Sequence, residues 1–168
     1  NGFEQKASSD ANAAFRSFER AVELGPEVER YALEQARLLR RAADASEDPE
    51  LELRLVSAAY DILKRYEQRD PQAWVTQLEL AGLSLRLGLL GQEERIPETA
   101  ARYTVVARLM EAYPFIQSEV AAAFVRIGDP QSALNYSTRA IAGEASTFGL
   151  SEAWWARGSA LMALGQTD

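Results

Sequence analysis

Six prolines divide the chain into helix-length segments. They stand at positions 26, 49, 71, 97, 114 and 130, so successive intervals are 23, 22, 26, 17 and 16 residues. Each proline is followed by apolar residues at three- and four-residue steps, the spacing of one helix face. In Asp48-Pro49, Asp70-Pro71 and Asp129-Pro130, the aspartate is placed to cap free amides while proline takes the first helical position. Gly25-Pro26 predicts a left-handed glycine that closes one helix before the next.

These patterns predict an all-α protein of about eight antiparallel helices. No segment alternates apolar and polar residues between turn signals, as a strand would. Alanines stand beside large apolar residues on the predicted helix faces, an arrangement that lets two helices approach closely. The predicted helices span residues 8–24, 27–45, 49–69, 71–87, 97–112, 114–127, 130–143 and 151–164.

Composition excludes several classes of function. The 168 residues include no cysteine and no histidine, which excludes disulfides and any thiolate or imidazole metal site. The formal net charge of −7 argues against nucleic-acid binding. No run approaches the roughly 20 apolar residues that span a bilayer, so no membrane insertion by these residues is expected. Acidic pairs such as Glu93-Glu94 lack a histidine, a cysteine or a glycine-rich phosphate loop, so we predict no enzyme activity, cofactor or metal.

Small and aromatic residues at fixed spacing resemble the tetratricopeptide repeat (TPR), a helix pair of about 34 residues. The resemblance covers most of the chain and is carried by four groups of residues. They are Ala14, Phe18, Ala21 and Pro26; Ala59, Leu63, Tyr66 and Pro71; Ala121, Ala123, Phe124, Gly128, Asp129, Ala133 and Ala140; and Trp154, Gly158, Ala160, Leu161 and Gly165. It implies a right-handed α-α superhelix, a TPR-like solenoid, in one domain over residues 1–168. Turns around Asp44–Asp48 and Gly91–Arg95 lengthen the middle repeats.

The repeat phase predicts a fragment of a longer chain. The sequence starts with Asn1, opens on what resembles a second helix, and closes on a first helix. Sequence segments such as Phe18–Pro26 are also similar to the soluble TPR tails of bacterial O-antigen polymerase or ligase-like membrane proteins. That likeness implies a bacterial protein, either cytoplasmic or tethered to the membrane through a missing part, in which any catalysis would reside.

The resemblance implies a scaffolding module that binds an extended peptide or protein partner in a concave groove lined by first helices. Its register places Arg41, Arg86 and Arg126 at one equivalent position, with Arg37 one turn before Arg41. These guanidinium groups favour an acidic partner, unless they are solvated or paired with neighbours such as Glu34.

The register also places Trp155 on the inner surface and Trp154 in a packing position. Trp155 either stacks on a partner or buries against a following repeat. If the apolar C-terminal helix is exposed, we expect self-association through it.

Overall fold

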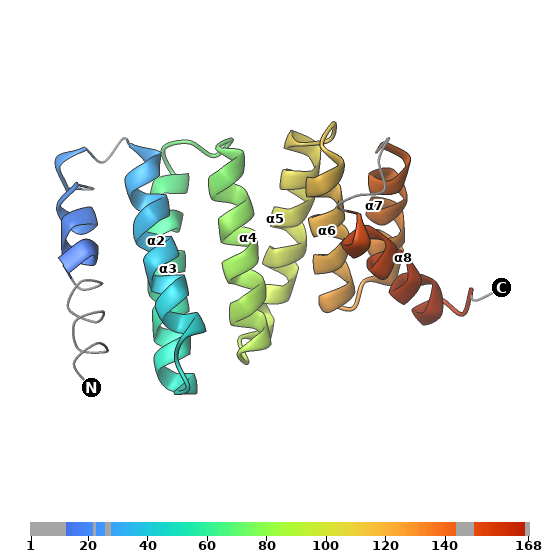
Figure 1. Ribbon diagram of the computed structural model, residues 1–168, viewed down its shortest axis with the longest axis horizontal. Helices are drawn as coiled ribbons and strands as arrows, with labels where there is room; N and C mark the ends of the chain where they lie inside the picture. The colour runs from blue at the N-terminus through green and yellow to red at the C-terminus, as the bar shows by residue number, and fades with distance from the viewer. Residues whose placement is uncertain (1–12, 22, 26–27, 144–149, 167–168) are drawn as a thin grey trace. The chain divides into compact units, whose positions relative to one another are not determined.

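The computed structural model describes residues 13–21, 23–25, 28–143 and 150–166, and these residues form helices without any strand (Figure 1). An N-terminal helical segment covers 13–21 and 23–24. The labelled elements are α2 (Glu29–Asp44), α3 (Pro49–Glu67), α4 (Trp74–Leu89), the short 3-10 helix η1 (Glu93–Arg95), α5 (Ile96–Leu109), α6 (Pro114–Arg126), α7 (Pro130–Gly143) and α8 (Ser151–Ala163). The all-α fold class is confirmed.

The chain forms two compact units, residues 1–92 and 93–168. In unit 1, α3 packs against both α2 and α4. In unit 2, α6 packs against α5, α7 and α8, and α7 also packs against α8. In keeping with the expected repeat register, we call α2, α4, α6 and α8 the first helices, and α3, α5 and α7 the second helices.

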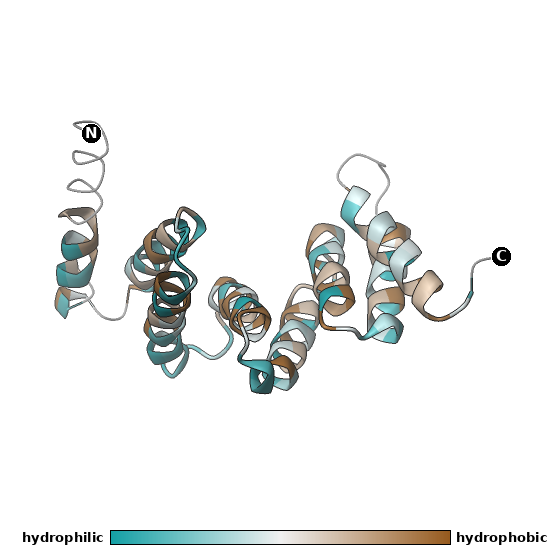
Figure 2. Ribbon diagram, turned by 90° about the horizontal axis from the view of Figure 1, so that it is seen from below, coloured by the Kyte–Doolittle hydropathy of each residue, from teal (hydrophilic) through white to brown (hydrophobic). Residues whose placement is uncertain are grey.

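Apolar side chains on the facing sides of the helices make the core of each unit. In unit 1, Val56, Leu63, Leu80 and Leu87 are fully buried. In unit 2 the contacts are made largely by small residues, which allow helix backbones to approach closely; they are Ala121, Ala122, Ala123, Ala133, Ala140, Ala153, Ala156 and Ala160. Hydrophobic and hydrophilic stretches share the same helices (Figure 2), as expected of amphipathic helices that pack on one side.

Two of the three Asp-Pro pairs open helices as predicted. The Asp48 carboxylate accepts a hydrogen bond from the Glu50 amide at 2.9 Å, and α3 begins at Pro49. Asp129 accepts hydrogen bonds from both the amide and the hydroxyl of Ser132, at 3.0 and 2.6 Å. At Asp70 the prediction is wrong, because the carboxylate binds the Gln72 amide in a turn and α4 begins only at Trp74. The same local hydrogen bond serves a turn as well as a cap.

The left-handed glycines are not where Gly25-Pro26 led us to expect one. Gly25 keeps a right-handed backbone, and its amide donates to the Ala21 carbonyl at 2.8 Å as in a continuing helix. Gly91, Gly128 and Gly165 have φ values of 103°, 79° and 69° and close α4, α6 and α8. After Gly128, for example, the Asp129 amide returns to the Phe124 carbonyl at 2.9 Å, a Schellman closure.

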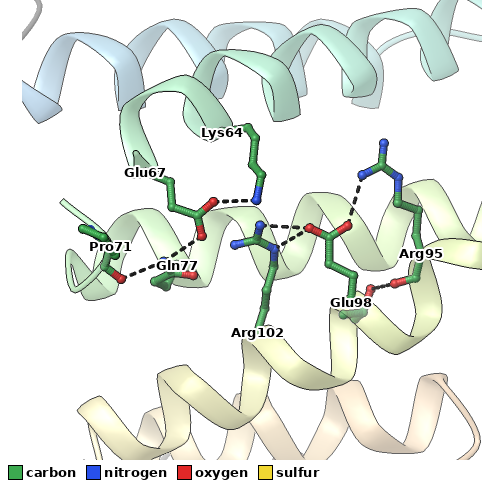
Figure 3. A network of polar contacts seen from close by, with 8 residues as sticks. Lys64, Glu67, Pro71, Gln77, Arg95, Glu98 and Arg102 are labelled. Atoms are coloured by element: carbon green, nitrogen blue, oxygen red, sulfur yellow. Dashed lines mark hydrogen bonds and ion pairs between the residues drawn. The ribbon is translucent and has the colours of Figure 1, made fainter. Parts of the chain in front are cut away.

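Two glutamines link the start of a first helix to the end of the preceding second helix. The Gln77 side chain donates to the Pro71 carbonyl at 2.8 Å and to Glu67 at 2.9 Å (Figure 3). Gln117, at the same place in α6, donates to the carbonyls of Ala107 and Met110 at the end of α5. The Met110 carbonyl also accepts from the Tyr113 amide at 3.1 Å, so the two glutamines add side-chain hydrogen bonds where one helix follows another.

Candidate binding faces on the first helices

Ion pairs connect α2 to α4, and Glu79 of α4 lies at their centre. Arg37 donates to Glu79 of α4 at 3.0 Å and to Glu34 of its own helix at 3.1 Å. Arg40 reaches the other oxygen of Glu79 at 3.3 Å. The hydrogen bond to Glu79 raises the pKa of Arg37 although partial burial lowers it. The predicted residue Arg37 is therefore engaged by two carboxylates.

Arg86 makes the corresponding contact at the far end of the same two helices. It donates to Glu52 of α3 at 2.7 Å and also pairs with Asp44, the last residue of α2. Burial lowers the pKa of Arg86, but the hydrogen bonds to Glu52 and Asp44 outweigh burial and raise it. Near the other end, the Thr76 hydroxyl donates to Glu29 at 2.7 Å. Contacts between matching turns show that α2 and α4 run parallel.

Arg41, Arg86 and Arg126 occupy one position in three helices. Each lies in the last turn of its first helix, twelve residues after the first residue (29 to 41, 74 to 86 and 114 to 126). Their surroundings differ, however. Arg41 is exposed and has no ion-pair partner in the described part of the chain.

Arg126 in unit 2 lies between an acidic and an aromatic side chain of α8. Its guanidinium group is 3.3 Å from the Glu152 carboxylate and 5.7 Å from the centre of the Trp155 ring. The side chains of Arg126 and Glu152 are 45% and 40% exposed, and Trp155 is 48% exposed. We call Arg126, Glu152 and Trp155 the Arg126 cluster. It brings together two of the residues singled out in the sequence, on adjacent first helices.

The expectation that Trp154 packs inside is wrong. Trp154 is 51% exposed and lies against Arg157, whose guanidinium carbon is 5.8 Å from the ring centre. The buried positions of α8 are Ala153, Ala156 and Ala160. Small residues suffice there because α8 lies close to α6 and α7. The chain therefore exposes two adjacent tryptophans, each beside an arginine.

Sequence reasoning missed the carboxylates that complete these faces. Glu79, Glu52 and Glu152 each meet an arginine of another helix. Their only sequence signal is their position on first turns or first-helix faces, which many other acidic residues of this chain share. Among the described residues, no three or more Asp or Glu side chains form a group that could hold a metal ion. At each of these faces, a carboxylate from outside the chain could take the place of the glutamate that the arginine now binds.

Arg95 of η1 and Glu98 and Arg102 of α5 form a further set of ion pairs. Arg102 is almost fully buried and donates to Glu98 one turn earlier at 2.9 Å, while Glu98 also accepts from Arg95 at 3.1 Å (Figure 3). None of the described helices is long and apolar enough to cross a bilayer.

Comparison with known proteins identifies the fold. No protein-family model matches the sequence, and no curated protein matches it significantly. Among solved structures, a thermophilic TPR protein of Thermus thermophilus superposes on 94% of this chain and 76% of its own, with a TM-score of 0.72 and 18% identity. The protein MamA superposes on 98% of this chain and 79% of its own, with a TM-score of 0.69 and 13% identity. The resemblance read from the sequence is confirmed at the level of the fold, and the chain has the all-α fold of TPR proteins.

Proposed function

We propose that the chain is a non-catalytic scaffolding module that binds a protein partner through its first helices. The TPR-like fold supports this class of function in general. The observation that carries the proposal here is the Arg126 cluster, in which a half-exposed tryptophan and arginine from two first helices lie in contact. Tryptophan and arginine are the residue types that most often dominate the binding energy of protein interfaces.

The arginines at matched positions give the partner its chemistry, which we propose is acidic. Within the described ranges, Arg41 is free to take a carboxylate directly. Arg126 pairs with one described carboxylate, Glu152, and its side chain remains 45% exposed. Arg37 and Arg86 each hold two internal carboxylates, so a partner must displace one of them. Asp44 is the easiest to displace from Arg86, because its side chain is 57% exposed while Glu52 is 23% exposed.

Peptide selection tests the proposal even though the partner is unidentified. A random-sequence phage-displayed peptide library is panned on the protein, and the best peptide is measured by fluorescence anisotropy. We expect Trp155→Ala to weaken its affinity about tenfold or more, as for a central contact of an interface. The matched control is Trp154→Ala, since Trp154 is similarly exposed, lies on the same helix and also stacks on an arginine.

The control decides between a specific face and general stickiness. Equal losses for Trp154→Ala and Trp155→Ala would show only that exposed indoles bind peptides, and no loss in either variant would place the peptide elsewhere. Both results contradict the proposed face.

The acidic preference has its own test. Arg41→Ala is compared with Arg54→Ala, because both arginines are exposed and have no ion-pair partner among the described residues, while Arg54 lies on the second helix α3. We expect selected peptides to be rich in Asp and Glu, and Arg41→Ala, alone or with substitutions at 86 and 126, to weaken them more than Arg54→Ala does. Selected peptides without acidic residues would refute the acidic preference.

The alternative function, an accessory domain of a membrane O-antigen polymerase or ligase, stays a hypothesis that rests on sequence words alone. It differs from the first proposal in context rather than in groove chemistry. The hydropathy of the full-length gene product separates the two: about ten or more hydrophobic spans of roughly 20 residues would support the membrane protein, and their absence would exclude it.

A further inference from the structure

A cavity of about 300 Å³ lies in unit 1, away from the ion pairs between α2 and α4. Three elements enclose it: the N-terminal helical segment, the first half of α2 and the last turns of α3. The lining residues are Glu19, Glu23, Val28, Ala32, Gln35, Ile62, Arg65, Tyr66 and Arg69. Its volume is at the lower end of the range for small-ligand pockets.

The most informative residue of this cavity is Gln35. It is only 5% exposed, yet its side-chain amide makes no hydrogen bond with any residue that the structure describes. Among the described residues, the completely buried side-chain atoms without a hydrogen-bond partner are Gln117 Oε1 and Ser118 Oγ, so the Gln35 amide keeps some access to solvent. The two comparable glutamines of this chain, Gln77 and Gln117, do use their side-chain amides to bind carbonyl groups. Gln35 is thus a buried amide with its donor and acceptor available to whatever enters the cavity.

The rest of the lining defines what can enter. Ala32 and Ile62 give the inner wall an apolar surface, and Val28 lies at the start of α2. Polar groups stand on opposite walls, with Glu19 on the N-terminal segment and Arg65 on α3. Glu19 has no hydrogen bond or ion pair to a described residue, and Arg65 uses one N–H to reach the Asp61 carbonyl at 3.3 Å. An aliphatic group with an amide fits this combination better than a charged group does, because opposite charges flank the cavity.

We propose that this cavity binds a peptide unit, an amide group next to an aliphatic side chain, with Gln35 pairing the amide. The side-chain amide of glutamine offers one acceptor oxygen and two N–H donors, which match the N–H and C=O of a peptide group. Ala32 and Ile62 then contact the aliphatic side chain. This site is separate from the proposed partner-binding face on the first helices, because residues of the N-terminal segment and of the second helix α3 line it.

The test observes Gln35 directly. The probe is N-acetyl-leucine methylamide, and its binding is followed through the Gln35 side-chain NH2 signals in nitrogen–proton NMR spectra. We expect these signals to shift in a saturable way. The matched probe, N-acetyl-leucine methyl ester, lacks one amide N–H and should bind several-fold more weakly.

A variant separates a binding role from a structural one. Gln35→Met keeps an unbranched side chain of similar size and removes the amide. Because the Gln35 side chain makes no hydrogen bond to a described residue, we expect the melting temperature of the free protein to stay within about 2 °C of the wild type, while affinity for the probe falls about tenfold. Gln131→Met, at an exposed position of α7, is the control and should change neither quantity.

The outcomes are decisive in both directions. A lower melting temperature for Gln35→Met would mean that Gln35 has a structural partner, and unshifted Gln35 signals would mean that the cavity does not take a peptide unit; either result overturns the proposal. Tighter binding of longer leucine-containing peptides would identify a protein segment as the source of the amide, and constant affinity a small molecule. None of these readouts involves Trp155, so this proposal and the proposed function fail separately.

Discussion

At the scale of single residues, Glu79 is the acceptor that two arginines share. Its side chain is 15% exposed, and Arg37 and Arg40 reach different oxygens of the same carboxylate. Charge-assisted hydrogen bonds of this kind are stronger in partly buried surroundings than on an open surface. The Glu79 carboxylate therefore links α4 to α2 and neutralises part of the positive charge of Arg37 and Arg40.

Replacing this carboxylate should measure that contribution. We expect Glu79→Gln to lower the free energy of unfolding by about 1–2 kcal/mol, because two guanidinium groups lose their charged acceptor. Glu23→Gln is the control, since its ion pair with Arg20 is more than half exposed and should contribute close to zero. Urea denaturation gives both values, and equal effects would contradict the special position of Glu79.

The ionisation of Tyr66 makes the stability of the fold depend on pH in the alkaline range. Burial raises its pKa, and the charges of Glu29 and Asp70 raise it further. The folded chain then keeps the phenol proton at a pH where the unfolded chain, with a tyrosine pKa of about 10, has lost it. This contribution to stability is complete below about pH 10 and is lost as the pH rises through the folded-state pKa.

Melting curves across alkaline pH test this linkage. We expect Tyr66→Phe to lose less stability than the wild type as the pH rises above about 10. Tyr113→Phe serves as the comparison, because Tyr113 is 57% exposed. A Tyr66→Phe curve parallel to that of the wild type would rule out a contribution from this residue.

The sequence alone placed the arginines and one local partner, Glu34 beside Arg37, but not the partners from other helices. A position in a helix follows from spacing, so the matched positions of Arg41, Arg86 and Arg126 could be predicted from the repeat register. Which carboxylate meets Arg86 depends on the crossing of three helices, and no local pattern encodes that Glu52 and Asp44 both come within reach. Their identification needed the tertiary structure.

At the scale of helices, two glycines should respond oppositely to the same substitution. Gly128 has a φ of 79°, a conformation that disfavours a side chain even though a Cβ would meet no atom within 4 Å. Gly158 lies inside α8, and a Cβ there would also meet nothing within 4 Å. We expect Gly128→Ala to destabilise the protein by about 1 kcal/mol and Gly158→Ala to stabilise it by about 0.5–1 kcal/mol. Thermal unfolding of the two variants checks the signs, and a shared sign would contradict this account.

Helix boundaries show where local signals succeed and where they fail. Asp48 and Asp129 capped helices as their sequence predicted, whereas Asp70 lies in a turn, four residues before the first residue of α4. The aspartate side chain bonds to the amide two residues on in both Asp48 and Asp70, so the local chemistry is the same. What differs is the continuation after Ala73, where α4 buries Thr76 and Gln77. Tertiary packing decides the helix start in such a case.

At the scale of the whole molecule, the first helices begin at residues 29, 74, 114 and 151, so their spacing is 45, 40 and 37 residues. All three intervals exceed the about 34 residues of a standard TPR. In the first interval, the 19-residue helix α3 and the turn at 68–73 supply part of the extra length. Of the two turns expected to lengthen the repeats, residues 45–48 form a short connection between α2 and α3, whereas residues 90–95, which include η1, form a longer one between α4 and α5.

Exposed apolar residues of α8 lead us to propose self-association at high concentration. Trp154, Trp155 and Met162 are 51%, 48% and 66% exposed. A cluster of this kind on one helix favours burial against another surface. We expect sedimentation equilibrium to show a weak, concentration-dependent oligomer that Met162→Gln diminishes. Leu89→Gln, which alters a 62% exposed leucine on α4, should leave the oligomer unchanged; the opposite order would exclude α8 as the contact.

The constant place of the arginine within α2, α4 and α6 has a use in protein engineering. The distance from helix start to arginine is twelve residues in α2, α4 and α6, although the intervals between the starts of these helices are 45 and 40 residues. The difference between these two intervals therefore lies in the turns and second helices and does not move this position. Under the proposed function, a designer could vary the side chain at this one position in each of the three helices to change what the repeat recognises, without altering the helix start.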